Sequence, residues 1–276
     1  MSQSIRPEPL ETVTAIATEA AALESFLAGR PESDLDRPSA CSEWTTGEVL
    51  AHLTWAATYF GGLIERGLKG DTTPPNLPPP GPARRQAIAD AAKRGRAELG
   101  PRLRQEFHDR NEALLARLRS IEPADWDTPT AHRAGPIRHL AQTRLNELAL
   151  HGWDIRSTLE PPGHLTEATL PALIAHLDRW YELLFRPDPA QTVPYRIRFD
   201  FAGDRVPARD LVIGTDSVHF EPADGAPDLT LTSHPEVAPL LAYGRVDVDA
   251  AITTYGATLS GRKELAPLLR TRFEMV

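Results

Sequence analysis

The chain has 276 residues, of which 41% are hydrophobic and 25% charged, a composition typical of a globular protein with room for two modest domains. The formal net charge is −8 and no Lys/Arg-rich block forms a basic stripe, which argues against nucleic acid as a partner; the single cysteine excludes an internal disulfide and a cysteine-rich zinc site. The first residues do not have the pattern of a signal peptide, and no apolar run is long enough to cross a membrane, so we expect a cytoplasmic protein without a membrane partner.

Helical periodicity dominates the chain up to about residue 187. Thr45 and Glu48 have the spacing of a capping box at the start of one helix. The proline-rich segment 71–82 predicts a long crossover loop, because proline fixes φ and has no N–H donor. The predicted helices cover residues 9–29, 45–68, 84–119 with an interruption at Gly100-Pro101, a segment from Gly135-Pro136 to about 160, and 165–185.

The pattern changes to period two after residues 186–194. Apolar and polar residues alternate from Tyr195 to Phe201, which predicts a half-buried strand. Further strands are predicted in 210–216, 217–225 and 228–233, and helices in 235–245 and 263–273. We therefore expect two domains, a helical bundle over residues 1–187 and a small α+β domain over 188–276.

The segment 137–159 carries the most informative residues. At about 100° per residue, one narrow arc of this helix holds four ionisable side chains, Arg144, Glu147, His151 and Asp154. The arc borders the buried stripe, and burying such a line is costly unless its members are paired or bind a metal. Glu147 and His151 are four residues apart, so one helical turn brings both side chains to the same place.

His52 lies within the apolar stripe of the predicted helix 45–68 and faces the same core. Taken alone, a helical Glu–His pair is more often a surface pair, and an inward histidine more often a core residue. Together they predict a mononuclear site at His52, Glu147 and His151, because two imidazoles and one carboxylate leave an open position on zinc. A di-iron site would need a second carboxylate–histidine helix. His176 is the only rival ligand.

Other catalytic motifs are absent from the sequence. It contains no nucleophile elbow, Walker loop, dinucleotide-binding glycine pattern or H-E-x-x-H helix. We interpret Cys41 as a small buried residue at a loop–helix junction rather than as a nucleophile.

Two motifs resemble those of the mycothiol-dependent maleylpyruvate isomerase family. C-S-E-W-T-T-G-E-V-L-A-H-L (41–53) is similar to the family's C-x-x-W segment with its following histidine, and R-L-N-E-L-A-L-H-G-W-D-I (144–155) is similar to its R-x-x-E-x-x-x-H-x-x-D motif. The stretch 243–265 resembles the family's smaller, sterol-carrier-like C-terminal domain. The resemblance implies a DinB-like four-helix bundle with zinc at His52, Glu147 and His151, although another divalent metal is possible, and mycothiol as thiol cosubstrate. It also implies a catalytic arginine, for which Arg245 is the first candidate and Arg262 the second.

Several neighbours of the predicted site have two interpretations. Asp154 either orients a ligand imidazole or forms a salt bridge with an arginine. Trp55 and Tyr59 either line a pocket or pack in the core. Arg144 is counted with Asp154 among the residues around the metal.

The leading functional hypothesis is a zinc-dependent mycothiol S-transferase or thiol-assisted isomerase acting on a small electrophilic metabolite. The alternatives are a zinc hydrolase that uses metal-bound water, and a non-catalytic protein that binds a metal or ligand. The sequence leaves the electrophile open, because residues 71–82 and 84–119 match no motif of the family. We expect a monomer or a homodimer.

Overall fold

The computed structural model describes residues 8–76, 78–79, 81–132, 135–203 and 206–273, which form two compact units. The first unit runs to Thr169 and the second begins at Leu170. This boundary lies earlier than the one expected near residue 187, because the helices that begin at Leu170 pack on elements of the C-terminal unit. Periodicity marks where helices give way to strands, but it does not say on which core a helix packs.

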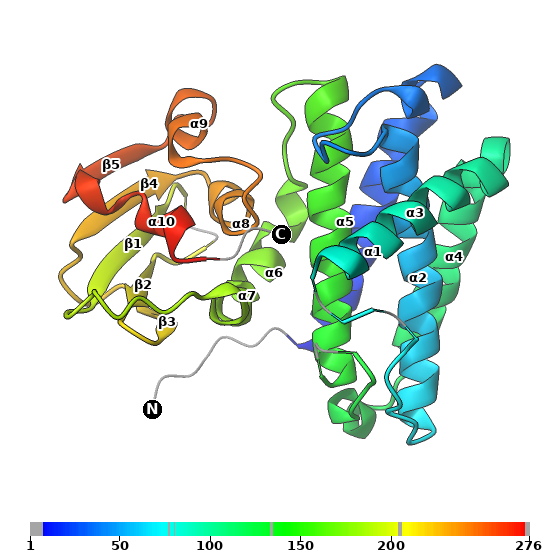
Figure 1. Cartoon of the computed structure of the whole chain (residues 1–276), viewed down its shortest axis with the longest axis horizontal. Helices are drawn as coiled ribbons and strands as arrows, with labels where there is room; N and C mark the ends of the chain where they lie inside the picture. Colours follow the sequence, from blue (N-terminus) through cyan, green and yellow to red (C-terminus); the bar gives the residue numbers. More distant parts are fainter. Residues whose placement is uncertain (1–7, 77, 80, 133–134, 204–205, 274–276) are drawn as a thin grey trace. The chain divides into compact units, whose positions relative to one another are not determined.

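The first unit is helical. Four of its helices, α1, α2, α4 and α5, run alongside one another and share a core, while α3 lies obliquely across α2 (Figure 1). The five helices are α1 (Pro9–Ala28), α2 (Thr46–Leu68), α3 (Pro82–Leu99), α4 (Leu103–Arg119) and α5 (Ile137–Leu159). Short 3-10 turns occupy Glu32–Asp36, Gly100–Arg102, Pro123–Asp127 and Glu167–Thr169.

Local sequence signals explain where these helices begin and end. Thr45 Oγ1 accepts a hydrogen bond from the backbone N–H of Glu48 at 3.2 Å, and Glu48 Oε2 accepts from the backbone N–H of Thr45 at 2.7 Å, so the predicted capping box is confirmed. Gly100, with φ at +51°, ends α3, and Pro101 follows it, which confirms the predicted interruption.

The second unit contains a five-stranded mixed sheet with short helices. The strands lie in the order β3-β2-β1-β4-β5, and β1 pairs parallel with β4 while the other neighbours are antiparallel. The strands are β1 (Tyr195–Phe201), β2 (Arg209–Ile213), β3 (Val218–Pro222), β4 (Leu229–Ser233) and β5 (Thr258–Gly261). The α-helices are α6 (Leu170–Ala175), α7 (Leu177–Leu184), α8 (Val237–Ala242), α9 (Val248–Thr253) and α10 (Leu268–Thr271), and Lys263–Leu265 form a 3-10 turn.

The two faces of β1 differ, as the predicted alternation requires. Ile197 and Phe199 are fully buried, and Phe199 packs edge-on against Tyr181 of α7, with the ring centroids 6.3 Å apart. The alternate residues Arg196 and Arg198 bind the fully buried carboxylate of Asp210 on β2. The sheet therefore has a core side covered by helix and a side held together by ion pairs.

Parts of the C-terminal unit differ from expectation. Helix α9 and strand β5 were not predicted: β5 has only four residues, too few for a clear alternation, and the six residues of α9 make fewer than two helical turns. The helix expected over 263–273 is a 3-10 turn followed by the short α10, with Pro267 between them. The helix expected over 165–185 is divided into a 3-10 turn, α6 and α7.

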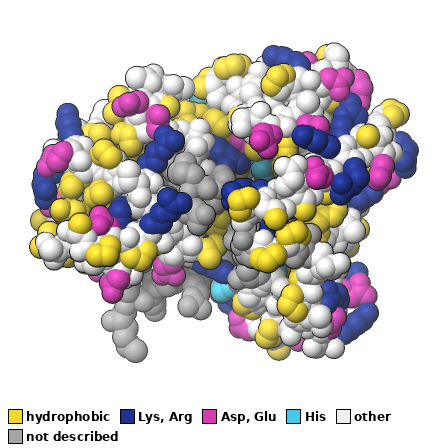
Figure 2. Space-filling view, viewed as in Figure 1, with side chains coloured by type: hydrophobic (Ala, Val, Ile, Leu, Met, Phe, Trp, Pro, Cys, Tyr) yellow, Lys and Arg dark blue, Asp and Glu magenta, His cyan; other side chains and the backbone are white. Residues whose placement is uncertain are grey.

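Two further observations concern the hydropathy of the helices and the charge on one face. Within the described part of the chain, none of the helices combines the length and hydropathy needed to span a membrane. On the face shown in Figure 2, basic and acidic side chains are interspersed.

Candidate metal centre

Three side chains from two helices of the first unit converge. His52 Nε2, on α2, lies 2.9 Å from Oε2 of Glu147 on α5, and His151 Nε2, one turn further along α5, lies 3.5 Å from the same oxygen. The rings of His52 and His151 stand edge to face with their centroids 5.0 Å apart. One potential ligand atom from each of the three residues lies within 4.8 Å of those of the other two.

The protonation of the three groups follows from burial and from their mutual contacts. Burial lowers the pKa of His52, despite its hydrogen bond with Glu147. Burial acts to raise the pKa of Glu147, but the hydrogen bond from His52 and the nearby positive charges outweigh it, so the pKa is about 2. Burial acts to lower the pKa of His151, while its contact with Asp154 raises that pKa to about 10. Glu147 is therefore an anion, ready to bind a cation.

Asp154 is fully buried and lies one turn beyond His151 on α5. Its Oδ2 is 2.8 Å from His151 Nδ1 and 3.1 Å from the Sγ atom of Cys41, which donates to it. A carboxylate on the distal nitrogen fixes both the tautomer and the plane of an imidazole. The hydrogen bond to His151 is the contact that the first of the two interpretations of Asp154 requires, and its role in orienting a metal ligand stays a prediction.

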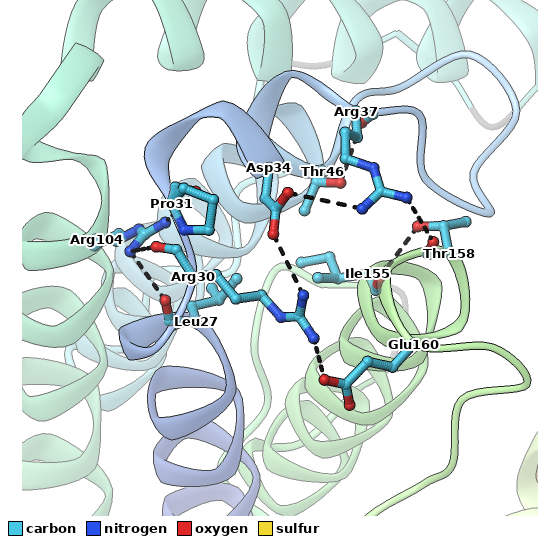
Figure 3. A network of polar contacts seen from close by, with 10 residues as sticks. All are labelled: Leu27, Arg30, Pro31, Asp34, Arg37, Thr46, Arg104, Ile155, Thr158 and Glu160. Carbon is cyan, nitrogen blue, oxygen red and sulfur yellow. Dashed lines mark hydrogen bonds and ion pairs between the residues drawn. The ribbon is translucent and has the colours of Figure 1, made fainter.

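The segment between α1 and α2, which contains Cys41, is fastened to the neighbouring helices (Figure 3). On one side, the guanidinium of Arg104 on α4 donates to the carbonyl oxygens of Leu27 and Arg30 at 2.9 and 3.0 Å. On the other side, Arg30 pairs with Glu160, and Arg37 donates to the carbonyl oxygen of Thr158 at 3.3 Å.

Closer to the candidate ligands, the backbone of this segment touches α5 directly. The N–H of Ala40 donates to the carbonyl oxygen of Asp154 at 3.0 Å. Ser39 Oγ accepts from the N–H of Cys41 at 3.1 Å and donates to the carbonyl oxygen of Trp44 at 2.8 Å. These hydrogen bonds fix the conformation of the turn, and the turn places both Cys41 and Trp44 beside the candidate ligands.

Aromatic rings surround the two histidines. The Trp44 ring centroid lies 5.1 Å from that of His52 and 6.0 Å from that of His151, and Trp55 lies 6.1 Å from His52 on the next turn of α2. Tyr59 stacks on Trp55 with centroids 4.8 Å apart. Trp55 and Tyr59 are half-buried, so they combine packing with partial access to solvent.

Arg144 lies one turn before Glu147 on α5 and is 1% exposed. Its Nη2 donates to Oδ1 of Asn111 on α4 at 2.6 Å, while Nε and Nη1 have no hydrogen-bond partner within the described part of the chain. Burial lowers the pKa of Arg144 to about 10, which still leaves it charged at neutral pH. Its positive charge favours the ionised form of Glu147.

The donor set fits a zinc ion. Two imidazole nitrogens and one carboxylate oxygen are the ligands of many catalytic zinc sites. Asp154 occupies Nδ1 of His151 and thereby directs Nε2 towards Glu147, which is the arrangement that a histidine ligand requires. A divalent cation would replace the protons that these atoms share.

The remaining predicted residues lie in the second unit. Arg245 follows α8, and its Nη1 donates to the carbonyl oxygen of Tyr243 at 3.2 Å. Arg262 pairs with Asp228 and Glu264. The buried His176 lies between α6 and α7, outside the ligand clusters formed by the described residues.

Sequence reasoning missed the contact of Cys41 with Asp154. Cys41 is half-buried, as a small residue at a loop–helix junction can be, but it also belongs to a second cluster of potential ligand atoms with His151 and Asp154. The usable signal was the motif itself, in which Cys41 and Trp44 precede His52 at fixed spacing. A contact that depends on the path of a loop cannot be predicted from periodicity, because a loop has no regular repeat.

Comparison with known proteins places these residues in a recognised domain. The family model described as the mycothiol maleylpyruvate isomerase N-terminal domain matches residues 16–156, which include every member of the two clusters. The sequence has no match among curated proteins.

Two solved structures have a similar fold. A crystal structure of the mycothiol-dependent maleylpyruvate isomerase covers 94% of this chain and 96% of its own, with a TM-score of 0.61 and 15% identity. The structure of a histidine-to-alanine mutant of such an isomerase covers 89% of this chain and 93% of its own, with a TM-score of 0.59 and 15% identity. Because the family model spans the larger part of the sequence, the chain belongs to the mycothiol maleylpyruvate isomerase family.

Proposed function

We propose that this protein is a zinc-dependent enzyme that uses mycothiol to isomerise a small electrophilic metabolite or to transfer the thiol to it. The observation that carries the proposal is the convergence of His52, Glu147 and His151 within the domain that the family model matches. Membership of an isomerase family supports thiol-dependent isomerisation as the reaction class.

The chain's own residues supply the surroundings that thiol chemistry needs. Only a thiolate is a strong nucleophile, and a free thiol of pKa near 8.5 is mostly protonated at pH 7. Zinc bound by these three residues would favour loss of that proton. Glu147 contributes one negative charge, so the site as a whole would keep a positive charge of about +1 to attract an anionic sulfur.

The surrounding side chains have positioning and shielding roles in this proposal. Asp154 holds the ring of His151, while Trp44 and Trp55 cover the rings of the two histidines and limit access of water. Arg245, in the C-terminal unit, is the first candidate for the catalytic arginine that the family resemblance implies, and Arg262 is the second. We assign the helical unit to the DinB-like bundles and the C-terminal unit to the sterol-carrier-like domains.

The test is a turnover assay with zinc-loaded protein, in the presence and absence of mycothiol. A panel of electrophiles that includes maleylpyruvate is followed by liquid chromatography and mass spectrometry. An isomer of unchanged mass or an adduct that contains the thiol, formed only with mycothiol, supports the proposal. Cleavage of a compound by water without thiol would identify a hydrolase, and no turnover of any compound would favour a binding protein.

A further inference from the structure

The proposed function leaves the position of Cys41 unexplained. Its sulfur lies 3.1 Å from Asp154 Oδ2 and 3.7 Å from His151 Nδ1, so it contacts both members of the Asp–His pair. Asp154 is 0% exposed, and a buried carboxylate takes the orientation that its hydrogen-bond donors impose. Cys41 and His151 donate to the same oxygen of Asp154.

We propose that Cys41 is a positioning residue of the metal centre. Its S–H group holds the carboxylate of Asp154, and Asp154 in turn holds the ring of His151 with Nε2 facing Glu147. The inference rests on the proposed function only in taking His151 as a ligand. The hydrogen bonds that join Cys41, Asp154 and His151 are observed in the structure and do not depend on that assignment.

The backbone around Cys41 is organised to place its sulfur. The N–H of Ala40 donates to the carbonyl oxygen of Asp154, which brings the loop onto α5 at the residue that the thiol contacts. Ser39 accepts from the N–H of Cys41 and donates to the carbonyl oxygen of Trp44, which closes a tight turn around the cysteine. Asp154 therefore binds this turn twice, with its carbonyl oxygen to Ala40 and with its carboxylate to Cys41.

Cys41, His151 and Asp154 also have the spacing of a possible second metal site. That use would require Nδ1 of His151 as a ligand to one ion while Nε2 binds another. The contact of 2.8 Å between Nδ1 and the Asp154 carboxylate instead has the length of a charge-assisted hydrogen bond. We therefore assign the cysteine a hydrogen-bonding role and expect a single zinc ion.

Three variants test the assignment against a matched control. Cys41→Ala and Cys41→Val remove the donor, Cys41→Ser keeps one, and Ser42→Ala alters the exposed neighbour in the same turn. Zinc affinity is measured by competition with a chromophoric chelator. Loss of one hydrogen bond predicts a decrease in affinity of about 3- to 10-fold in the alanine and valine variants. Affinity should be retained in the serine variant and the control.

Nuclear magnetic resonance of the imidazole nitrogens gives a readout that a packing role would not move. We expect the Nδ1–H signal of His151 to shift or to exchange faster in Cys41→Ala and Cys41→Val, and to stay in place in Cys41→Ser. Thermal melting checks that each variant folds. If the alanine variant does not fold, the valine variant takes its place in both measurements.

Two results would overturn the proposal: wild-type affinity and an unchanged His151 signal in both apolar variants, or two zinc ions per wild-type chain. If wild-type protein binds no zinc, the proposed function fails. The spectrum of the metal-free variants then still decides whether Cys41 positions the Asp154–His151 pair.

Discussion

His151 and Asp154 lie one turn apart on α5, and Nδ1 of the first is 2.8 Å from Oδ2 of the second. A metal would have to displace one proton from His151, whose pKa is about 10 without a metal, and because Asp154 holds the proton on Nδ1, Nε2 is the nitrogen left to bind the metal. Nε2 is also the nitrogen that faces Glu147. Contacts within α5 alone therefore determine which nitrogen of His151 is available to a metal, and His52 of α2 has no part in this.

Each candidate ligand should be necessary for metal binding. We expect about one zinc per chain in the wild-type protein and a sharp loss of zinc in His52→Ala, Glu147→Ala and His151→Ala, with the helical content preserved. Elemental analysis gives the metal content and circular dichroism the helicity. His108→Ala is the matched control, because this histidine is exposed on α4 and pairs only weakly with Glu24. Full zinc occupancy in all three ligand variants would show that the metal lies elsewhere.

Removal of the metal should destabilise the helical unit, because an ion at the proposed site would join α2 to α5. A ligand that binds only the folded state stabilises it by about 2.7 kcal/mol at a free concentration 100 times its Kd. Calorimetry should therefore show a lower melting temperature after chelation, and recovery when zinc is returned. In His151→Ala the melting temperature should not respond to zinc, and a response as large as that of the wild type would contradict the assignment.

Cobalt substitution should reveal the thiol at the metal. When mycothiol is added to the cobalt-loaded protein, we expect sulfur-to-cobalt charge-transfer absorption in the near ultraviolet, because the three protein ligands leave a position open. His151→Ala should not show this band. Turnover that is equally fast with and without thiol would refute the mechanism and favour hydrolysis.

Arg245 should affect turnover without affecting metal binding. We expect Arg245→Ala to lower kcat/KM and to leave the zinc content at its wild-type level, because the residue lies in the other unit. Arg262→Ala is the comparison, since the Arg262 side chain is already paired with Asp228 and Glu264. A large loss of activity in Arg262→Ala alone would transfer the role to Arg262.

The polar side of the sheet should contribute to the stability of the C-terminal unit. Asp210→Asn keeps the shape of the side chain but removes the charge that binds Arg196 and Arg198, whose side chains are 25% and 21% exposed. Because water partly screens the two arginines, we expect the free energy of unfolding to fall by about 1–3 kcal/mol. Urea unfolding measures the change, and Asp216→Asn, at an exposed position, should leave stability unchanged.

Periodicity and spacing were sufficient to select the three candidate ligands, whose side chains lie close together, while their role in binding a metal stays a prediction. A helix of 3.6 residues per turn fixes which side chains share a face, so Glu147 and His151 had to lie together, and the apolar stripe of α2 turned His52 inward. The contact between Cys41 and Asp154 could not be predicted in this way. It depends on the path of a loop, which is set by hydrogen bonds between residues far apart in the sequence.

The C-terminal unit shows a second limit on what can be predicted from the sequence. Strand β1 was predictable because seven residues alternate clearly, whereas β5 has only four and lies at the edge of the sheet. The domain boundary depended on the packing of α6 and α7, and amphipathic periodicity does not identify the partner of a helix.

The hydrogen bonds that hold the α1–α2 connection have a consequence for the length of this loop. Arg104 anchors the connection near Arg30, and Ala40 anchors it on Asp154, so the chain between these two points has little slack. An inserted or deleted residue in this stretch would carry Cys41 past Asp154 even if every side chain kept its identity. The number of residues between the anchors, which precede the motif 41–53, is thus a further requirement of the site, and a change in loop length would be as damaging to the site as the loss of a named residue.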